Sequence, residues 1–151
     1  DRTQPGSVVA PLEKLSIIVF SGSFDCVHYA LATAAAAAAT NIPVTLLFTM
    51  GAIRALARDE TGGPRWKELT HSEDEGNGSV WDIRYQTNGA AGFEELLEAC
   101  VALEVKFLVC EMGLRAAGLD EKTLRDDVPI EHGGLVTFLA DAETNGSMLF
   151  I

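Results

Sequence analysis

The chain has 151 residues, 48% of them hydrophobic, and 22 acidic side chains against 11 basic ones give it a net charge of −11. This length and apolar content predict one globular domain with a real core. The acidic excess argues against nucleic acid and anionic membrane surfaces as partners, because proteins bind both through Lys and Arg.

Strand-like and helix-like segments alternate in the first half of the chain, after a predicted flexible leader over residues 1–13. The first helical segment contains six consecutive alanines, Ala34 to Ala39, which have high helix propensity. Strands that alternate with helices over short joints predict a parallel sheet with right-handed crossovers. The expected elements are a strand over 15–21, a helix over 24–40, a strand over 44–49 and a short helix over 50–58.

Residues 59–92 differ from the rest of the predicted domain, which covers 14–151. They are rich in Gly, Glu, Asp, Asn and Thr and show no clear periodicity. We interpret them as an insertion, and a lid, an oligomer contact and a mobile segment all remain open.

The second half returns to periodic segments. Phe93, Leu96, Leu97 and Cys100 recur at spacings of three and four, which indicates an amphipathic helix with these residues inward. The expected elements are a helix over 93–103, a strand over 105–110, helical turns within 114–127, a helix over 133–143 and a terminal strand over 147–151.

Cys110 is the leading candidate for a working residue. It ends a mostly apolar run typical of a strand buried on both faces, and open α/β sheets bind ligands at the carboxyl ends of their strands. The alternative is a core cysteine, because free cysteine is among the most buried residue types. A helix start after Cys110 would favour the reactive thiolate, whereas the carboxylate of Glu111 would oppose it.

Three further side chains are weighed as its neighbours. Cys26 lies in the first turn of the first helix, and it could approach Cys110 if the first strand neighbours the strand that ends at Cys110. The pair could then act as a relay, although Cys26 also fits a plain helix residue. His28 could activate a thiol as a base or could simply be a partly exposed helix residue, and Glu111 is the third candidate.

Several other chemistries are absent from the sequence. No G-x-G-x-x-G, Walker or G-x-S-x-G motif is present, and no cluster has metal-ligand spacing, so neither a cofactor nor a metal is expected. No apolar run reaches the roughly 20 residues of a membrane helix, so no membrane partner is expected. The chain has three cysteines without a C-x-x-C, which fits a reducing cytoplasm. Thiol chemistry or plain binding remains.

Several segments follow one another in a set order over residues 14–151. They are Ile17–Gly22, the alanine-rich helix, Pro43–Gly51, the helix from Phe93, the strand that ends in Cys110, Gly113-Leu114, Gly118-Leu119, Gly133–Val136 and Phe150-Ile151. This ordered set resembles the DsrE/DsrF-like family. The resemblance implies a three-layer, flavodoxin- or Rossmann-like α/β fold with a central, largely parallel five-stranded sheet. It also implies a homo-oligomer, a trimer or a hexamer, and a cysteine that accepts sulfane sulfur as a persulfide, at the position of Cys110.

The resulting expectation is a cytoplasmic sulfur carrier or sulfurtransferase-like protein. Cys110 would hold the persulfide and pass its outer sulfur to a partner thiol, with sulfur donor and acceptor proteins as partners. Cys26, His28 and Glu111 would surround the sulfur. The alternative is a non-catalytic oligomeric module that binds a small ligand or a protein; a thiol peroxidase is weakened because no resolving pair is evident.

Overall fold

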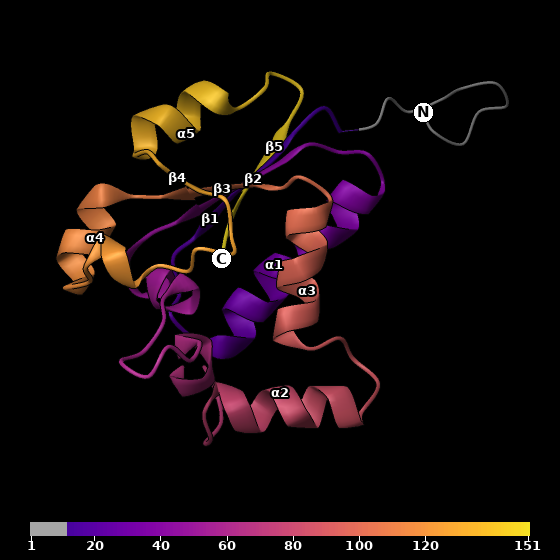
Figure 1. Cartoon of the computed structure of the whole chain (residues 1–151). Helices are drawn as coiled ribbons and strands as arrows, with labels where there is room; N and C mark the ends of the chain where they lie inside the picture. Colours follow the sequence, from indigo (N-terminus) through magenta and orange to yellow (C-terminus); the bar gives the residue numbers. More distant parts are fainter. Residues whose placement is uncertain (1–11) are drawn as a thin grey trace, which may run out of the picture.

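A five-stranded sheet forms the centre of the molecule (Figure 1). The computed structural model describes residues 12–151, so the predicted leader over 1–13 lies almost wholly outside the described residues. All strand pairs are parallel, and the strand order is β4-β3-β2-β1-β5. The strands are β1 (Leu15–Val19), β2 (Val44–Phe48), β3 (Lys106–Val109), β4 (Ile130–His132) and β5 (Ser147–Phe150).

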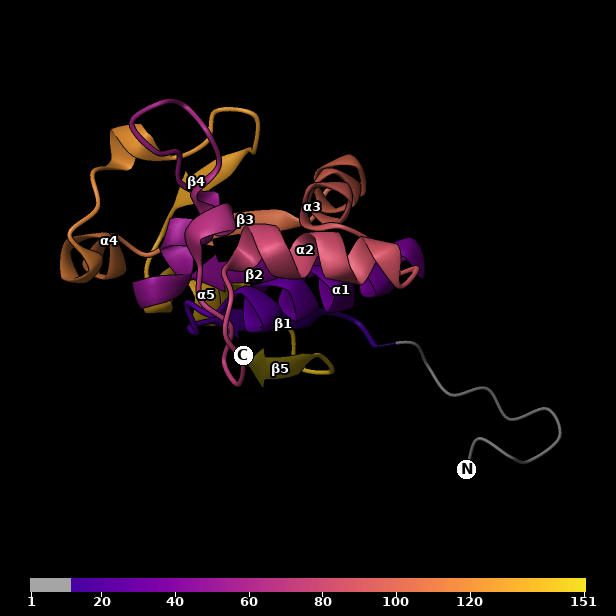
Figure 2. The same ribbon diagram turned by 90° about the horizontal axis from the view of Figure 1, so that it is seen from below.

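Helices cover the two faces of the sheet unequally. Figure 1 shows α1 (Phe24–Ala39) and α3 (Phe93–Ala102) directly below the sheet and α2 (Gly78–Thr87) beneath them, while α5 (Leu135–Asp141) lies above. In Figure 2, which views the molecule from below, α2 lies in front of α1. The chain steps from β1 to β4 in one direction and then returns to the far side of β1. A right-handed crossover in the reverse direction places its helix on the opposite face, which explains the position of α5.

The remaining helical segments are short. The helix α4 (Glu111–Ala117) follows β3 directly, and 3₁₀ turns occupy η1 (Met50–Leu56), η2 (Arg65–Glu68) and η3 (Glu121–Thr123). The α/β class, the three layers and the five-stranded sheet expected from the sequence are confirmed, and the sheet is wholly parallel.

Side-chain alternation along the strands builds two unequal cores. Ile17, Leu46 and Phe107 share one row of the sheet and belong to the main core, which includes residues of α1 and α3. The opposite face holds a smaller cluster, in which Leu47, Leu108 and Cys110 pack with Phe138 of α5. The main core is therefore closed by two long helices, and the second face depends on one short helix.

An ion-pair cluster fastens α5 to the amino ends of the strands. Asp141 accepts hydrogen bonds from Thr45 at 2.6 Å and from Lys106 at 3.2 Å, and it pairs with Lys14 at 2.8 Å. Burial raises the pKa of Asp141, but the hydrogen bonds from Lys14, Thr45 and Lys106 outweigh it and lower that pKa to about 2. The carboxylate is therefore charged at neutral pH and links three separate strands to α5.

Residues 59–92 contain more regular structure than the sequence indicated. They form η2 and the ten-residue helix α2, whose Asn77 cap accepts a hydrogen bond from Val80 N. Trp66 of η2 stacks on Phe93 with ring centroids 4.7 Å apart, so the segment is joined to the main core. Two other features differ from expectation. The strand β4 was not predicted, and α4 begins at Glu111 instead of residue 114.

Within residues 12–151, no helix combines the length and the apolar character needed to cross a membrane. The same part of the chain holds no group of three or more His, Cys, Asp or Glu side chains arranged to bind a metal ion.

Candidate functional site

Cys110 lies at the junction of β3 and α4, on the carboxyl edge of the sheet. Its backbone N–H donates to Phe48 O at 3.1 Å, as a continuation of the β2–β3 pairing, and its carbonyl accepts from Leu114 N at 2.9 Å in the first turn of α4. Because side chains alternate along a strand, Cys110 shares a face with Leu108 and points toward α5. The backbone therefore holds the cysteine from both sides.

A hollow of about 450 Å³ opens beside Cys110. Only 3% of the cysteine is exposed, so the thiol forms part of the wall and does not project into solvent. The rim carries apolar side chains, among which Met112 is half exposed and Val136 is 83% exposed. The residues that line the hollow are Cys110, Glu111, Met112, His132, Gly133, Gly134, Leu135 and Val136.

Charge around this hollow is negative or neutral. Glu111 is exposed at its edge, and the His132 ring lies 3.6 Å from a carboxylate oxygen of Glu121. Among residues 12–151, no Lys or Arg lines the hollow. A small anion thus finds no fixed cation here, whereas a neutral group or a positively charged protein surface meets no repulsion.

Gly113 fixes the position of α4 and therefore of the residues that flank Cys110. A Cβ atom at Gly113 would lie 2.7 Å from Thr49 Oγ1 and 2.8 Å from Met50 N, closer than non-bonded atoms can approach. The missing side chain lets α4 pack directly on the turn after β2. The sequence Cys110-Glu111-Met112-Gly113 thus combines a thiol, two rim residues and a close-packing glycine.

The structure does not bring Cys26 and His28 to Cys110. The condition for the Cys26–Cys110 approach was that β1 neighbours β3, and β2 lies between them. Cys26 and His28 line a different hollow, which is formed by α1, α2, α3 and Ile151. Of the three expected neighbours, Glu111 alone shares the hollow of Cys110.

The cysteines differ in their surroundings, and all three are free thiols. Cys100 is fully buried in α3, its Sγ–H donates to Leu31 O at 3.4 Å, and burial raises the pKa of the Cys100 thiol to about 12. Its expected core role is confirmed. Cys26 is partly exposed, so a thiol reagent reaches Cys26 more readily than Cys110.

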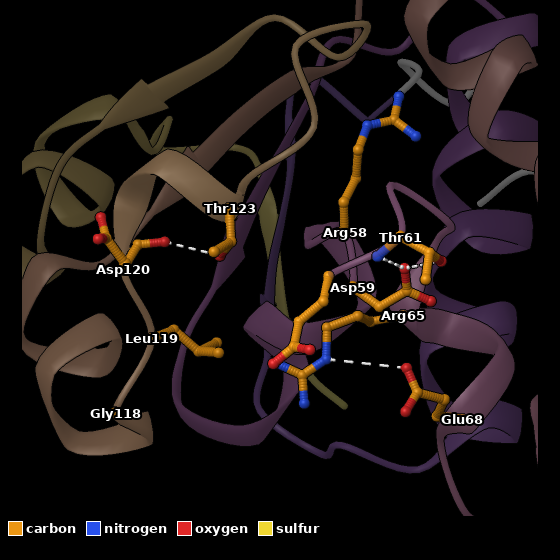
Figure 3. A pocket seen from close by; sticks show the side chains of 10 residues that line it. Arg58, Asp59, Thr61, Arg65, Glu68, Gly118, Leu119, Asp120 and Thr123 are labelled. Carbon is orange, nitrogen blue, oxygen red and sulfur yellow. Dashed lines mark hydrogen bonds and ion pairs between the residues drawn. The ribbon is translucent and has the colours of Figure 1, made fainter.

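A charged hollow of about 650 Å³ lies between the turn after η1 and the end of α4 (Figure 3). Arg58 pairs with Asp127 at 3.4 Å and donates to Gly62 O, and Arg65 faces Glu68 at 4.0 Å. Figure 3 shows the guanidinium of Arg58 turned away from that of Arg65. Within the described residues, four carboxylates line this hollow against two arginines and no cysteine does, so these side chains do not form an anion or thiol site.

Sequence reasoning identified Cys110 and Glu111 but did not connect them to His132, Leu135 and Val136. His132 ends β4, which was not predicted, and Leu135 and Val136 begin α5 directly after it. Because β3 and β4 are parallel neighbours, their carboxyl ends meet at the same edge, with Val109 opposite His132. The short apolar-polar run Ile130-Glu131-His132 before Gly133 was the available signal.

Comparisons with known proteins agree with this arrangement. The chain is 28% identical over 158 residues to the protein YrkE of Bacillus subtilis (strain 168). This alignment covers 92% of this chain and 97% of YrkE. The crystal structure of the ychN protein from E. coli superposes with a TM-score of 0.54 at 18% identity, over 93% of this chain and all of the other. The structure of MTH1491 from Methanobacterium thermoautotrophicum superposes with a TM-score of 0.57 at 12% identity, over 91% of this chain and 98% of the other.

The two solved structures share the fold of this chain. A family model covers nearly the whole sequence, because the DsrE/DsrF/DrsH-like family matches residues 11–150. This match, together with the parallel sheet in which Cys110 follows β3, shows that the chain belongs to the DsrE/DsrF/DrsH-like family.

Proposed function

We propose that the protein is a sulfur carrier or sulfurtransferase-like protein that accepts sulfane sulfur on Cys110. The observation that carries the proposal is the thiol at the end of β3, beside a hollow with an apolar rim, in a chain of this family. A cytoplasmic setting suits this chemistry, because thiols are kept reduced there. The acidic chain favours a donor and an acceptor with basic surfaces.

The transfer balances without an outside oxidant. The Cys110 thiolate attacks the outer sulfur of a donor persulfide, a new S–S bond forms, the donor's S–S bond breaks, and the donor leaves as a thiolate. The acceptor thiolate then attacks the outer sulfur on Cys110, and Cys110 leaves as a thiolate. Since 3% of Cys110 is exposed, side chains at the rim must move to admit the donor. Val136 and Leu135 belong to α5, whose one buried residue is Phe138.

The direct test is sulfur loading followed by intact and peptide mass measurement. After incubation with a persulfide donor, we expect an adduct of about 32 Da on the Cys110 peptide, the mass of one sulfur atom. Cys110→Ser should lower loading at least about tenfold, because a hydroxyl cannot replace the thiolate nucleophile. Cys26→Ser is the matched control and should keep the Cys110 adduct. Equal uptake by Cys110→Ser and the wild type would reject the assignment.

A second candidate function is a non-catalytic oligomeric binding module. The burial of Cys110 favours it. Titration of the native Cys26→Ser variant with a small thiol reagent separates the two candidates, because that variant lacks the partly exposed thiol. A reactive Cys110 supports the carrier, and an inert Cys110 supports the module.

We also propose that a homo-oligomer, a trimer or a hexamer, covers the apolar surface on the α5 side of the sheet. We call this surface the open face. Phe20 and Phe150 contact each other there with ring centroids 5.4 Å apart, and Phe150 is 67% exposed. The remaining members of the open face are Met148 and Leu139, which do not line the Cys110 hollow. A contiguous exposed apolar patch is typical of a protein–protein interface.

Sedimentation of charge variants tests the oligomer. The wild type should sediment as a multimer, and Leu139→Glu should weaken association at least about a hundredfold, because an interface would bury its unpaired charge. Ile83→Glu is the matched control, since Ile83 is an exposed apolar residue of α2, away from the open face. A monomeric wild type, or equal effects of the two variants, would contradict the proposed interface.

A further inference from the structure

The hollow lined by Cys26 and His28, of about 660 Å³, lies on the α1 side of the sheet beside the carboxyl ends of β1 and β5. Its walls come from α1, α2, α3 and the residue after β5. Phe20 N and Ser21 N both donate to Ile151 O, which anchors this corner to the two strand ends. The side chains that matter for its chemistry are Cys26, His28, Tyr29, Tyr85, Leu96 and Ile151.

This hollow lies where the order of the strands in the sheet changes direction, between β1 and β5. From β1 the chain continues to β2 on one side, and β5 arrives on the other side after a crossover over the opposite face. Parallel α/β sheets bind ligands outside the carboxyl ends of their strands at such a switch point. Cys110 follows β3, which lies between β2 and β4, so its hollow is not at the switch point.

His28 is a polar side chain of this hollow whose ring is held in place by its neighbours. His28 is 9% exposed, and its Nε2 lies 2.8 Å from Ala91 O. A carbonyl oxygen only accepts hydrogen bonds, so Nε2 carries the hydrogen in this contact, and in the tautomer with its one hydrogen on Nε2 the lone pair is on Nδ1. Within residues 12–151 no group donates to Nδ1. The ring is held edge-on to Tyr85 at a centroid distance of 4.9 Å, so the orientation of this acceptor is fixed.

The charges around the hollow define the class of ligand. No Lys or Arg from the described part of the chain lines it, and the carboxylate of Asp25 already accepts hydrogen bonds from the backbone N–H and the hydroxyl of Ser72. Burial, together with Asp25 and Cys26, raises the pKa of Tyr85, so its hydroxyl stays neutral. The hollow thus combines largely apolar walls with the hydroxyls of Tyr29 and Tyr85 and the acceptor at Nδ1 of His28. Its described lining holds no cation that would select an anionic ligand.

We propose that this hollow binds a small, uncharged aromatic molecule whose one hydroxyl or N–H group donates to Nδ1 of His28. The ring of the ligand would lie against Tyr85, Tyr29 and Leu96. This site is independent of sulfur transfer at Cys110, because the two hollows share no lining residue.

The test uses p-cresol as the probe and toluene as its donor-free counterpart, titrated into the full chain labelled with ¹³C and ¹⁵N. We expect saturable shifts at Cys26, Tyr85 and Leu96 and a change in the ¹⁵N resonance of His28 Nδ1. Toluene should bind about fivefold more weakly, the effect of one hydrogen bond. His28→Phe should remove the preference for p-cresol. Equal affinities of p-cresol and toluene for the wild type would overturn the proposal.

A second pair of variants keeps the test valid if His28→Phe is unstable. Ala32 is half buried and lines the hollow, so Ala32→Phe should fill it and abolish p-cresol binding. Ala36 lies one turn further along α1 and is exposed, so Ala36→Phe is the matched control and should bind like the wild type. Unchanged binding by Ala32→Phe, or shifts centred on the Cys110 hollow, would also overturn the proposal.

Discussion

Gly78→Ala is expected to lower the free energy of unfolding by at least about 3 kcal/mol, because the added methyl group has no space. A Cβ atom at Gly78 would lie 2.1 Å from Trp66 O and 2.9 Å from Phe24 Cδ1. The first of these neighbours is backbone, so the strain cannot be relieved by a side-chain rotation. Gly78 also donates to Leu69 O at 2.7 Å, which ties the start of α2 to the segment after η2.

The measurement is urea unfolding followed by fluorescence and circular dichroism, with Gly134→Ala as the control. A Cβ atom at Gly134 meets nothing within 4 Å, so that variant should stay within about 1 kcal/mol of the wild type. Similar stabilities of Gly78→Ala and the wild type would show that α2 does not pack on Trp66 as described. Because Tyr85 of α2 lines the hollow of His28, Gly78→Ala should also weaken p-cresol binding.

The helix α2 also shows where sequence reasoning fails. Sequence patterns locate a surface helix by an apolar face turned inward. In α2 the buried residues are Gly78 and Asp82, whereas Val80 and Ile83 are exposed. The buried carboxylate of Asp82 accepts hydrogen bonds from Phe93 N and from the Gln86 side chain. The bond from Phe93 N caps the start of α3. Trp81 and Tyr85 also pack against the main core, but they are only partly buried. A helix positioned largely by polar contacts and a close backbone approach leaves a weak periodic signal.

The strands show the opposite case. The runs at β1, β2 and β3 are apolar because both of their faces are covered, and each was predicted to within a few residues. The strand β4 has three residues at the edge of the sheet, two of them exposed, so its sequence resembles a loop. Without β4, the pairing that brings His132 beside the end of β3 could not be inferred.

The candidate site was predictable only as far as local sequence reaches. A thiol at the end of a buried strand is visible in the residues before Cys110. The separation of Cys26 from Cys110 depends on strand order, which places β2 between β1 and β3 and is set by the packing of the whole sheet. The same strand order creates the switch point beside His28, which local sequence cannot indicate.

Arg125→Met should lower the free energy of unfolding by about 2–3 kcal/mol, because it breaks a charge network that joins three distant segments. The Arg125 side chain is 5% exposed and forms two hydrogen bonds to Glu94, at 2.6 and 2.8 Å, as well as an ion pair with Asp127 at 2.7 Å. Trp66 Nε1 also donates to Glu94 at 2.6 Å. Methionine fills a similar volume but leaves the carboxylates without their cation.

The pH dependence identifies the cause of this loss. Burial raises the pKa of Glu94, but hydrogen bonds from Arg125 and Trp66 outweigh it and hold the pKa below 4.5. A carboxyl with a lowered pKa stabilises the fold above its ordinary pKa, and this contribution is lost as the pH falls. The difference between Arg125→Met and the wild type should therefore shrink below pH 4.5. Arg58→Met is the control, since Arg58 is partly exposed and pairs with Asp127 at 3.4 Å; it should cost less than about 1 kcal/mol. Equal losses for the two variants, or a loss for Arg125→Met that does not change with pH, would assign the effect to packing instead of charge.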